Sequence, residues 1–409
     1  MRQPSLPRTL VVLLACASGF SVANVYYAQP LLGALADDFG ISRAAVGGVI
    51  TATQAGSVLA LLLLVPLGDL LPRRRLMLAQ LLALVVALAA AACAHNAAWL
   101  MAAMLAVGLL GTAMTQGLIA YAAAAAQPAE RGAVVGAAQG GVVSGLLLAR
   151  VVAGSVADLA GWRAVYGGSA LAMLVMAGLL WRLLPALPIQ QPSLSYPRLL
   201  ASMFTLLRDD RVLQLRGVIA LLMFAAFNIL WSALVLPLSA APYHYSHAAI
   251  GAFGLVGMAG TLAATRAGRW ADRGYSRRTS ATALVLLVLS WLPLSLAFQP
   301  GTGVTTTISM LILGILMLDL GVQALHVTNQ GLIFGTSGGA HSRLVGCYML
   351  FYAVGSGIGA WAATAVFSVA GWNGVCALGA AVSLAALVCW AWTGSDKLLE
   401  RRVCDTHQF

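Results

Sequence analysis

Residues 42–48 read Ser-Arg-Ala-Ala-Val-Gly-Gly, and residues 246–252 read Ser-His-Ala-Ala-Ile-Gly-Ala. Each segment opens with a serine, a residue whose side chain is suited to cap the start of a helix. Two further pairs repeat at nearly the same separation: Gly68–Arg75 (GDLLPRRR) with Gly268–Arg278 (GRWADRGYSRR), and Ala160–Val165 (AGWRAV) with Ala370–Val375 (AGWNGV). These separated matches predict a chain made of two related halves.

The composition predicts a membrane protein. The sequence is 61% hydrophobic and only 9% charged, with a mean hydropathy of +0.90. Globular domains are roughly 45–50% apolar and about 25% charged. Stretches such as Leu76–Ala92 and Ser280–Phe298 supply the ~20 apolar residues that a helix needs to span a bilayer. An ordinary soluble protein is therefore excluded.

Charged residues, prolines and glycines divide the chain into apolar segments. They predict twelve spanning helices, at 8–36, 44–67, 75–94, 98–125, 132–158, 163–184, 212–240, 247–269, 278–298, 304–333, 343–369 and 373–394. The fold class is an all-α membrane protein with two six-helix bundles related as parallel repeats. We expect an N-terminal bundle (1–184), a cytoplasmic linker (185–211), a C-terminal bundle (212–394) and a cytoplasmic tail (395–409).

The positive charges predict the orientation. Of the 23 Lys and Arg residues, Arg43 and Arg163 fall in loops of one side and Arg150 falls inside a helix; the others, Arg216 among them, are assigned to the opposite side. Because cytoplasmic loops are enriched in Lys and Arg, we expect a bacterial inner (plasma) membrane protein with both termini in the cytoplasm. These charges face the anionic inner leaflet, and their scatter over short loops argues against a nucleic-acid partner.

The sequence does not indicate a metal site or a cofactor site. Its six cysteines are scattered and lack the spacing of a zinc site or a disulfide framework. A nucleophile–base pair or a soluble catalytic domain is not recognisable either. We therefore expect no metal, no cofactor and no enzymatic activity.

The two arginine-rich repeats resemble a known loop signature. Residues 68–75 and 268–278 are similar to the Gly-x-x-x-Asp-Arg-x-Gly-Arg-Arg loop of the major facilitator superfamily. Residues 24–30 (NVYYAQP) and 318–323 (LDLGVQ) further resemble its bacterial arabinose-efflux-like and drug-efflux-like permeases. The resemblance covers essentially the whole chain and implies the major facilitator fold, alternating access and a small-molecule substrate. We expect a monomer.

The chain departs from the family pattern in two helices. Met104 stands where many proton-coupled drug antiporters carry an arginine in helix 4, and Arg150 replaces a proline of the helix 5 antiporter motif. Both departures move the predicted proton coupling onto Asp319 and Arg150.

Three side chains are candidates for proton coupling: Asp319, Arg150 and His326. Asp319 lies near the middle of its predicted helix, where burial disfavours the charged carboxylate and favours proton uptake; the alternative is a buried Asp satisfied by hydrogen bonds. Arg150 cannot easily be neutralised, so it binds an anionic substrate, pairs with Asp319 or braces the structure. His326 relays protons or is a neutral core histidine.

In the family, helices 1, 4, 7 and 10 line the central cavity, and each carries polar or aromatic residues at mid-depth here. The expected substrate-binding residues are Asn24, Tyr27, Thr115, Gln116, Asn228, Trp231, Asp319 and Gln323. Such a mostly neutral cavity with aromatic walls suits sugars, amphipathic metabolites or drugs.

The repeated Asp/Arg loops are interpreted as a cytoplasmic gate, made of Asp69, Arg73, Arg74, Asp272, Arg273 and Arg277. Their carboxylates can accept charge-assisted hydrogen bonds from the arginines. The alternative is that these charges only set the orientation of the chain in the membrane, which explains the arginines but not the repeated Asp.

The predicted function is secondary active transport of small organic solutes, as a proton-coupled exporter that works by alternating access. A proton-independent or symport uptake carrier is the first alternative. A membrane-embedded sensor or enzyme is the more distant one, because no catalytic constellation supports it.

Overall fold

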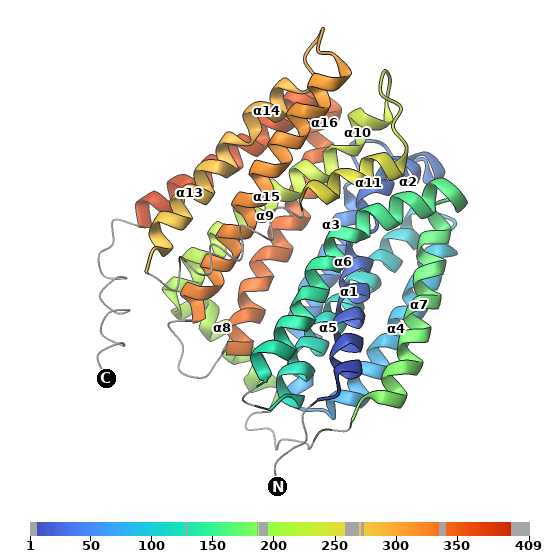
Figure 1. Cartoon of the computed structure of the whole chain (residues 1–409), viewed down its shortest axis with the longest axis vertical. Helices are drawn as coiled ribbons and strands as arrows, with labels where there is room; N and C mark the ends of the chain where they lie inside the picture. Colours follow the sequence, from blue (N-terminus) through green and yellow to red (C-terminus); the bar gives the residue numbers. More distant parts are fainter. Residues whose placement is uncertain are drawn as a thin grey trace. The chain divides into compact units, whose positions relative to one another are not determined.

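A computed structural model describes residues 6–127, 130–185, 187, 195–257, 270, 274–334 and 341–393 of the 409-residue chain. Within those ranges the regular structure is entirely helical (Figure 1). Ten of the helices are long and apolar enough to cross a membrane. The predicted all-α fold class is confirmed.

The twelve predicted spans each have a helical counterpart. The longest candidate span, Arg343–Trp392, contains Gly371 with a φ of 58° and a ψ of −157°, so it comprises two helices. The segment predicted at 247–269 is represented by a shorter apolar helix, His247–Val256; residues 258–269 lie outside the described ranges.

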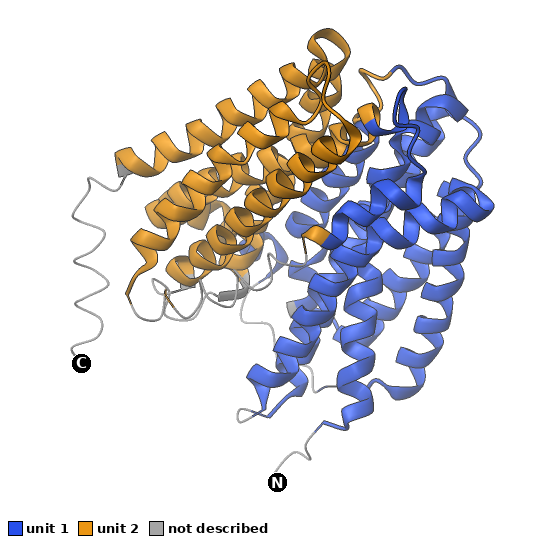
Figure 2. Ribbon diagram, turned by 45° about the horizontal axis from the view of Figure 1, so that its top comes forward, with its two compact units in different colours: residues 1–42, 48–200, 238–255 blue, residues 43–47, 201–237, 256–409 orange. Residues whose placement is uncertain are grey.

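Two compact units divide the chain (Figure 2). Unit 1 consists of residues 1–42, 48–200 and 238–255. In it α1 packs against α5 and α6, α3 packs against α5, and α4 packs against α5 and α7. Its helices are α1 (Arg8–Tyr26), η1 (Gln29–Leu31), α2 (Leu32–Phe39), α3 (Gly48–Leu59), η2 (Ala60–Leu64), η3 (Pro66–Asp69), α4 (Arg73–Ala92), α5 (Ala97–Ala125), α6 (Arg131–Ala160), α7 (Trp162–Leu183) and nearly all of α11 (His247–Val256).

Unit 2 consists of residues 43–47, 201–237 and 256–409. Here α9 packs against α15 and α16, and α13 and α14 pack against both of those helices. Its helices are α9 (Arg211–Ala233), α13 (Ser276–Leu289), α14 (Trp291–Leu296), α15 (Val304–Phe334) and α16 (His341–Thr393). Two short helices, α8 (Tyr196–Asp209) and α10 (Val235–Ser239), cross the boundary between the units in sequence.

The Ala-Gly-Trp repeat forms equivalent turns. Gly161 has a φ of 79° and Gly371 a φ of 58°, a left-handed region that suits glycine because it lacks a Cβ atom. Each following tryptophan is buried and uses its indole N–H. Trp162 donates to Oδ2 of Asp38 at 3.0 Å, and Trp372 donates to the carbonyl oxygen of Leu294 at 2.7 Å.

The two serine segments of the first repeat behave differently. Ser246 caps α11 as predicted, because its Oγ accepts from the backbone N–H of Ala249 at 3.2 Å. In contrast, α3 begins at Gly48 and residues 43–47 form turns, so the predicted start at residue 44 and a capping role for Ser42 are wrong. Instead, the N–H of Gly47 donates to Oγ1 of Thr364 at 3.2 Å within unit 2.

The stretch between residues 185 and 211 contains a helix that the sequence did not predict. In α8, Leu199 and Met203 are buried while Arg198 and Phe204 are exposed, so the helix is amphipathic. The following α9 starts separately because Oδ1 of Asp210 accepts from the N–H of Leu213 at 2.9 Å.

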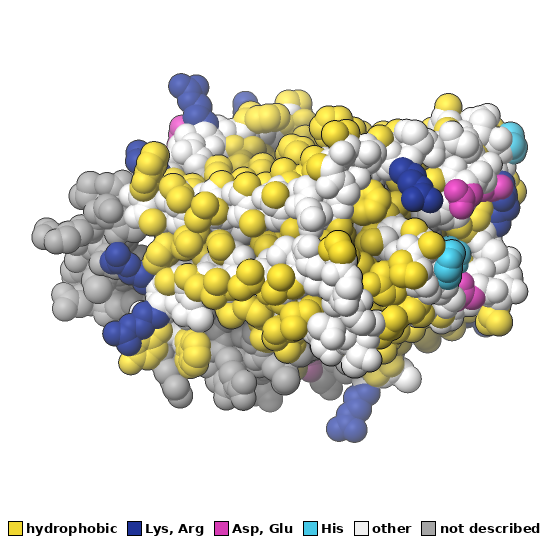
Figure 3. All heavy atoms as spheres, turned by 90° about the horizontal axis from the view of Figure 1, so that it is seen from above, with side chains coloured by type: hydrophobic (Ala, Val, Ile, Leu, Met, Phe, Trp, Pro, Cys, Tyr) yellow, Lys and Arg dark blue, Asp and Glu magenta, His cyan; other side chains and the backbone are white. Residues whose placement is uncertain are grey.

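Large apolar side chains cover much of the surface. Val86, Leu159 and Trp181 are exposed by 67%, 88% and 67%, and Figure 3 shows hydrophobic side chains over most of one face, with charges towards its margins. Such extensive apolar surface is unusual for a soluble monomer and suits contact with lipid.

Candidate functional site

The predicted site residues are divided between the two units. Unit 1 holds Asn24, Tyr27, Thr115, Gln116 and Arg150, and unit 2 holds Asn228, Trp231, Asp319, Gln323 and His326. Each set is therefore described by itself.

Arg150 is a buried cation in α6, with 2% of its surface exposed. Its Nε donates to Oε1 of Gln29 at 2.8 Å, and its guanidinium carbon lies 5.9 Å from the ring centroid of Tyr26. Gln29 offers an oxygen but no charge, and Tyr26 offers the face of its ring. These two partners orient the guanidinium, and neither was predicted from the sequence.

Asn24 and Tyr27 share a partner on another helix. Ser169 of α7 donates from its Oγ to Oδ1 of Asn24 and also contacts the Tyr27 hydroxyl. The Nδ2 of Asn24 donates to the carbonyl oxygen of Phe20, one turn earlier, at 2.9 Å. All three side chains are buried, so this polar cluster lies inside unit 1.

The two predicted residues of α5 have different surroundings. Thr115 is buried, and its Oγ1 donates to the carbonyl oxygen of Gly111 in its own helix at 2.8 Å. Such a back-bond satisfies the hydroxyl locally. Gln116 is half-buried and has a longer side chain available for an external partner.

In unit 2, Asn228 and Trp231 lie one turn apart near the end of α9. The Nδ2 of Asn228 donates to the carbonyl oxygen of Phe224 at 3.1 Å, and the ring of Trp231 lies 6.2 Å from that of Phe227. On α15, Asp319 is buried, with 5% exposure, while Gln323 is half-buried.

His326 is set in an aromatic cluster. Its Nδ1 shares a hydrogen bond with the hydroxyl of Tyr348 at 3.0 Å, and its ring stands edge-on to Phe224 at 5.3 Å. Phe224 in turn stands edge-on to Tyr352 at 4.2 Å. The histidine is therefore anchored by unit 2 itself.

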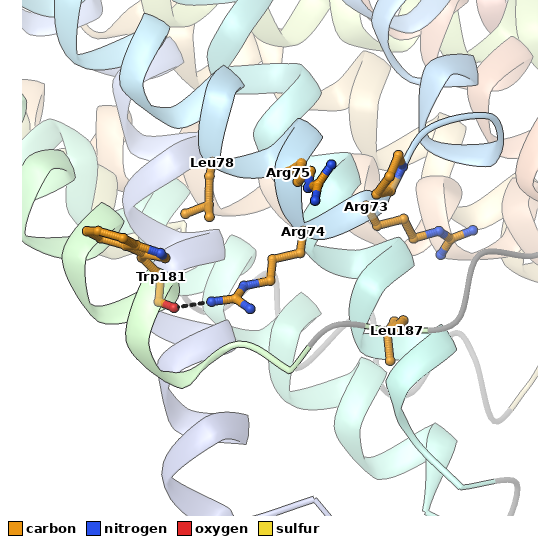
Figure 4. Close-up of a pocket in the computed structure, with 7 residues that line it drawn as sticks. Arg73, Arg74, Arg75, Leu78, Trp181 and Leu187 are labelled. Atoms are coloured by element: carbon orange, nitrogen blue, oxygen red, sulfur yellow. Dashed lines mark hydrogen bonds between the residues drawn. The ribbon is translucent and has the colours of Figure 1, made fainter.

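The arginines at the start of α4 line a cavity of about 430 Å³. Arg73 donates to the carbonyl oxygens of Gly68 at 3.1 Å and Ala120 at 2.7 Å, and Arg74 donates to that of Trp181 (Figure 4). Arg74 thus links the start of α4 to the end of α7, whereas Arg73 reaches η3 and α5. The cavity is lined by Pro72, Arg73, Arg74, Arg75, Leu78, Trp181 and Leu187.

The acidic side chains of the predicted gate lie outside the residues that the structure describes. The side chain of Asp69 and the whole of Asp272 and Arg273 lie outside the described residues. Arg277 lies in the first turn of α13.

Asp158, near the end of α6, makes a contact that the sequence did not indicate. Its Oδ1 accepts from the N–H of His247 at 3.0 Å and pairs with His247 Nδ1 at 2.8 Å, and its Oδ2 accepts from the N–H of Ala248 at 2.8 Å. Asp158 therefore caps α11 from another helix. The helices approach closely, because a methyl group on Gly154 would overlap the carbonyl of His247, and one on Gly251 that of Arg150.

A sequence comparison decides the family. The Major Facilitator Superfamily profile matches residues 14–266 and 217–402. The chain belongs to the Major Facilitator Superfamily. It is therefore a multi-pass membrane transporter, and its family consists of transporters rather than enzymes.

Relatives and solved structures within the superfamily agree with the fold. The chain is 40% identical over 396 residues to the transporter YgaY of Escherichia coli strain K12, covering 95% of this chain and 96% of that one. The nucleoside transporter NupG has a TM-score of 0.73 at 14% identity, covering 95% and 100% of the two chains. The human organic anion transporter MFSD10 has a TM-score of 0.69 at 18% identity, covering 94% and 100%.

Proposed function

We propose that this superfamily member is a proton-coupled exporter of small organic solutes that works by alternating access. The observation that carries the proposal is the burial of two ionisable side chains, Asp319 and Arg150, inside spanning helices. Ionisable groups are costly within a bilayer and mark transport pathways and proton relays.

Asp319 is the group that takes up and releases the coupled proton. It lies about midway along α15, and water-poor surroundings disfavour its charged form. Changes in its exposure during alternating access therefore change its protonation. Arg150 stays charged. Its positive charge therefore stays the same whether the solute is bound in its anionic or its neutral form. His326 is the proposed relay.

The substrate-binding surface is assigned to the polar residues of helices 1, 4, 7 and 10. Asn24, Tyr27 and Gln116 offer hydrogen-bonding groups in unit 1, with Thr115 behind them. The corresponding residues of unit 2 are Asn228, Trp231, Asp319 and Gln323. Sugars and amphipathic metabolites or drugs fit such a mixture of amide, hydroxyl and aromatic groups.

Two sets of contacts are proposed as gates. On the cytoplasmic side the gate consists of Asp69, Arg73, Arg74, Asp272, Arg273 and Arg277. On the outer side it is the packing of α11 on α6, which is held by Asp158 and the backbone of His247 and Ala248. Opening one gate while the other is closed exposes the solute to one side at a time. The moving bodies are the bundles 1–184 and 212–394, which the segment 185–211 links.

We further place the chain as a monomer in the bacterial inner membrane, with both termini, including the tail 395–409, in the cytoplasm. The positive charge of the α4 cavity supports this orientation, because basic pockets between spanning helices bind anionic headgroups on the cytoplasmic side. Anionic lipids of the inner leaflet are its proposed partners there.

Uptake, either proton-independent or by symport, is the second candidate. The same buried Asp319 and Arg150 are compatible with it, because direction depends on relative rates and gradients rather than on a residue type. Of the similar solved structures, one is a nucleoside transporter and another is an organic anion transporter, so a small polar organic solute suits either direction.

The test uses purified protein in liposomes with an imposed pH difference and three labelled probes: L-arabinose, benzoate and ethidium. The proposal predicts that at least one probe accumulates above its equilibrium level and that a protonophore abolishes the accumulation. If the probes only equilibrate across the membrane and do not respond to the pH difference, the result would support facilitated diffusion instead.

A further inference from the structure

Arg216 is a cation inside unit 2, although the charge pattern assigned it to a loop. It lies between one and two turns inside the start of α9, and its side chain is half-buried. Its Nη1 donates to Oγ of Ser280 at 3.4 Å and to Oδ1 of Asn329 at 3.5 Å. N–H···O hydrogen bonds usually measure about 2.7–3.2 Å, so both contacts are weak, and both acceptors are neutral.

The charge of Arg216 has no carboxylate partner within the part of the chain that the structure describes. A guanidinium remains protonated under all ordinary conditions. Groups of this kind, when taken out of bulk water, are normally paired with an anion. Among the described residues, the surroundings of Arg216 therefore lack a negative group.

Asn329 adds a second donor beside this cation. Its side chain is fully buried, and its Nδ2 lies near the hydroxyl of Tyr348 but makes no hydrogen bond of good geometry with any described residue. Its Oδ1 faces Arg216, so the amide and the guanidinium are neighbours. Nδ2 carries two N–H donors, so an oxygen acceptor at this point would accept from both the amide and the guanidinium.

The same end of unit 2 holds the aromatic cluster. Tyr348 lies close to Arg216 and Asn329 and is hydrogen-bonded to His326. Phe224 packs against His326 and Tyr352, and its carbonyl accepts from Asn228. An apolar wall therefore lies between the cation and a predicted substrate-binding residue.

We propose that Arg216 and the Nδ2 group of Asn329 bind the carboxylate of an amphipathic organic acid. Its apolar body packs against Phe224 and its aromatic neighbours. A carboxylate fits this site because guanidinium groups bind it through two parallel charge-assisted hydrogen bonds. This assignment rests on the proposed function, because it names the class of solute that the transporter carries.

The most informative variant is Asn329→Asp. It has nearly the same shape as the original residue and places a carboxylate oxygen beside Arg216, where Oδ1 already lies. The internal carboxylate then occupies the place of the ligand. Arg216→Gln removes the cation, and Arg182→Gln, at an exposed arginine in the last turn of α7, is the matched control.

The probe is benzoate, with benzamide as its neutral analogue, and the readout is the thermal unfolding midpoint of purified protein in detergent. Wild type and Arg182→Gln should show a midpoint that rises with the logarithm of benzoate concentration, and benzamide should have little effect. Asn329→Asp should unfold at a higher temperature without ligand and no longer respond to benzoate. Arg216→Gln should not respond either. An equal benzoate response in Asn329→Asp, or none in wild type, would overturn the assignment.

A lipid phosphate is the other source of an anionic oxygen, and a separate arm distinguishes it. If phosphatidylglycerol, but not benzoate, stabilises wild type and this effect needs Arg216, the site binds a headgroup and the assignment to a solute is wrong. Transport measurements distinguish a failure of the proposed function from a failure of this inference. Benzoate binding without movement of any probe contradicts the proposed function alone, whereas accumulation of L-arabinose without benzoate binding contradicts this inference alone.

Discussion

The guanidinium of Arg150 is held by the neutral side-chain oxygen of Gln29, 2.8 Å from its Nε. Replacing the amide of Gln29 by a carboxylate would therefore add a negative charge beside Arg150 without a change of shape. The pair links α6 to the short helix that follows α1, so it tests whether Arg150 acts by charge or by packing.

The first prediction concerns Gln29→Glu. The new carboxylate should pair with Arg150 and strengthen the hydrogen bond, so the unfolding midpoint should not fall. Transport should nevertheless fall by about tenfold or more, which corresponds to about 1.4 kcal/mol, because the positive charge is cancelled. Gln29→Met, of similar length and neutral, is the control that leaves the charge. Normal transport by Gln29→Glu would show that Arg150 is only a brace.

The packing of α11 on α6 gives the second prediction. Gly154→Val should separate the two helices, because its Cβ would overlap the carbonyl of His247, whereas Gly140→Val on the same helix meets nothing within 4 Å. Overpacking of this kind costs about 1–3 kcal/mol. Maleimide labelling of Ala248→Cys, in a chain whose native cysteines are replaced, should become faster in Gly154→Val only. Equal labelling in both valine variants would argue against a gate here.

Replacement of Asp158 should weaken the same contact by graded amounts. Asp158→Asn keeps one acceptor oxygen and should lose part of the capping of α11, whereas Asp158→Ala leaves the N–H groups of His247 and Ala248 without this acceptor. Loss of such a partner costs about 1–3 kcal/mol. The unfolding midpoint should therefore fall in the order wild type, Asn variant, Ala variant. Identical midpoints would mean that solvent replaces the carboxylate at no cost.

The arginine cavity at the start of α4 should respond to anionic lipid. In nanodiscs, phosphatidylglycerol should raise the unfolding midpoint of wild type relative to phosphatidylcholine, and the double variant Arg74→Gln/Arg75→Gln should lose that difference. Each basic residue near an anionic surface contributes about 1 kcal/mol. The exposed Arg43, predicted on the opposite side, supplies the control Arg43→Gln, which should behave as wild type. A lipid effect that survives in the double variant would place the headgroup site elsewhere.

The helices were predictable because each span is an apolar run of sufficient length, and the family because its loop signature recurs. The differences between the predicted and the observed helices have local causes. The start of α3 was missed because residues 43–47 are apolar enough for a helix but form turns that bond to Thr364. The linker helix α8 was missed because it has only 14 residues, too few for a membrane span, and its apolar residues are interrupted by polar and charged ones.

Side-chain partners were the least predictable feature. Gln29 and Arg150 are separated by 121 residues, and Ser169 and Asn24 by 145. A neutral amide or hydroxyl carries no sign of its partner in a single sequence. Arg216 was assigned to a loop from its charge alone, although position 216 lies within the predicted span 212–240. Its place inside α9 is what revealed the pair with Asn329.

The most direct test of the central claim is solute accumulation driven by a pH difference in liposomes, compared between wild type and Asp319→Asn. The account predicts that wild type accumulates at least one of the three probes. It also predicts that Asp319→Asn still exchanges labelled for unlabelled probe across the membrane but no longer accumulates it. Undiminished pH-driven accumulation by Asp319→Asn would contradict the account, because proton coupling would then not depend on the buried carboxylate of α15.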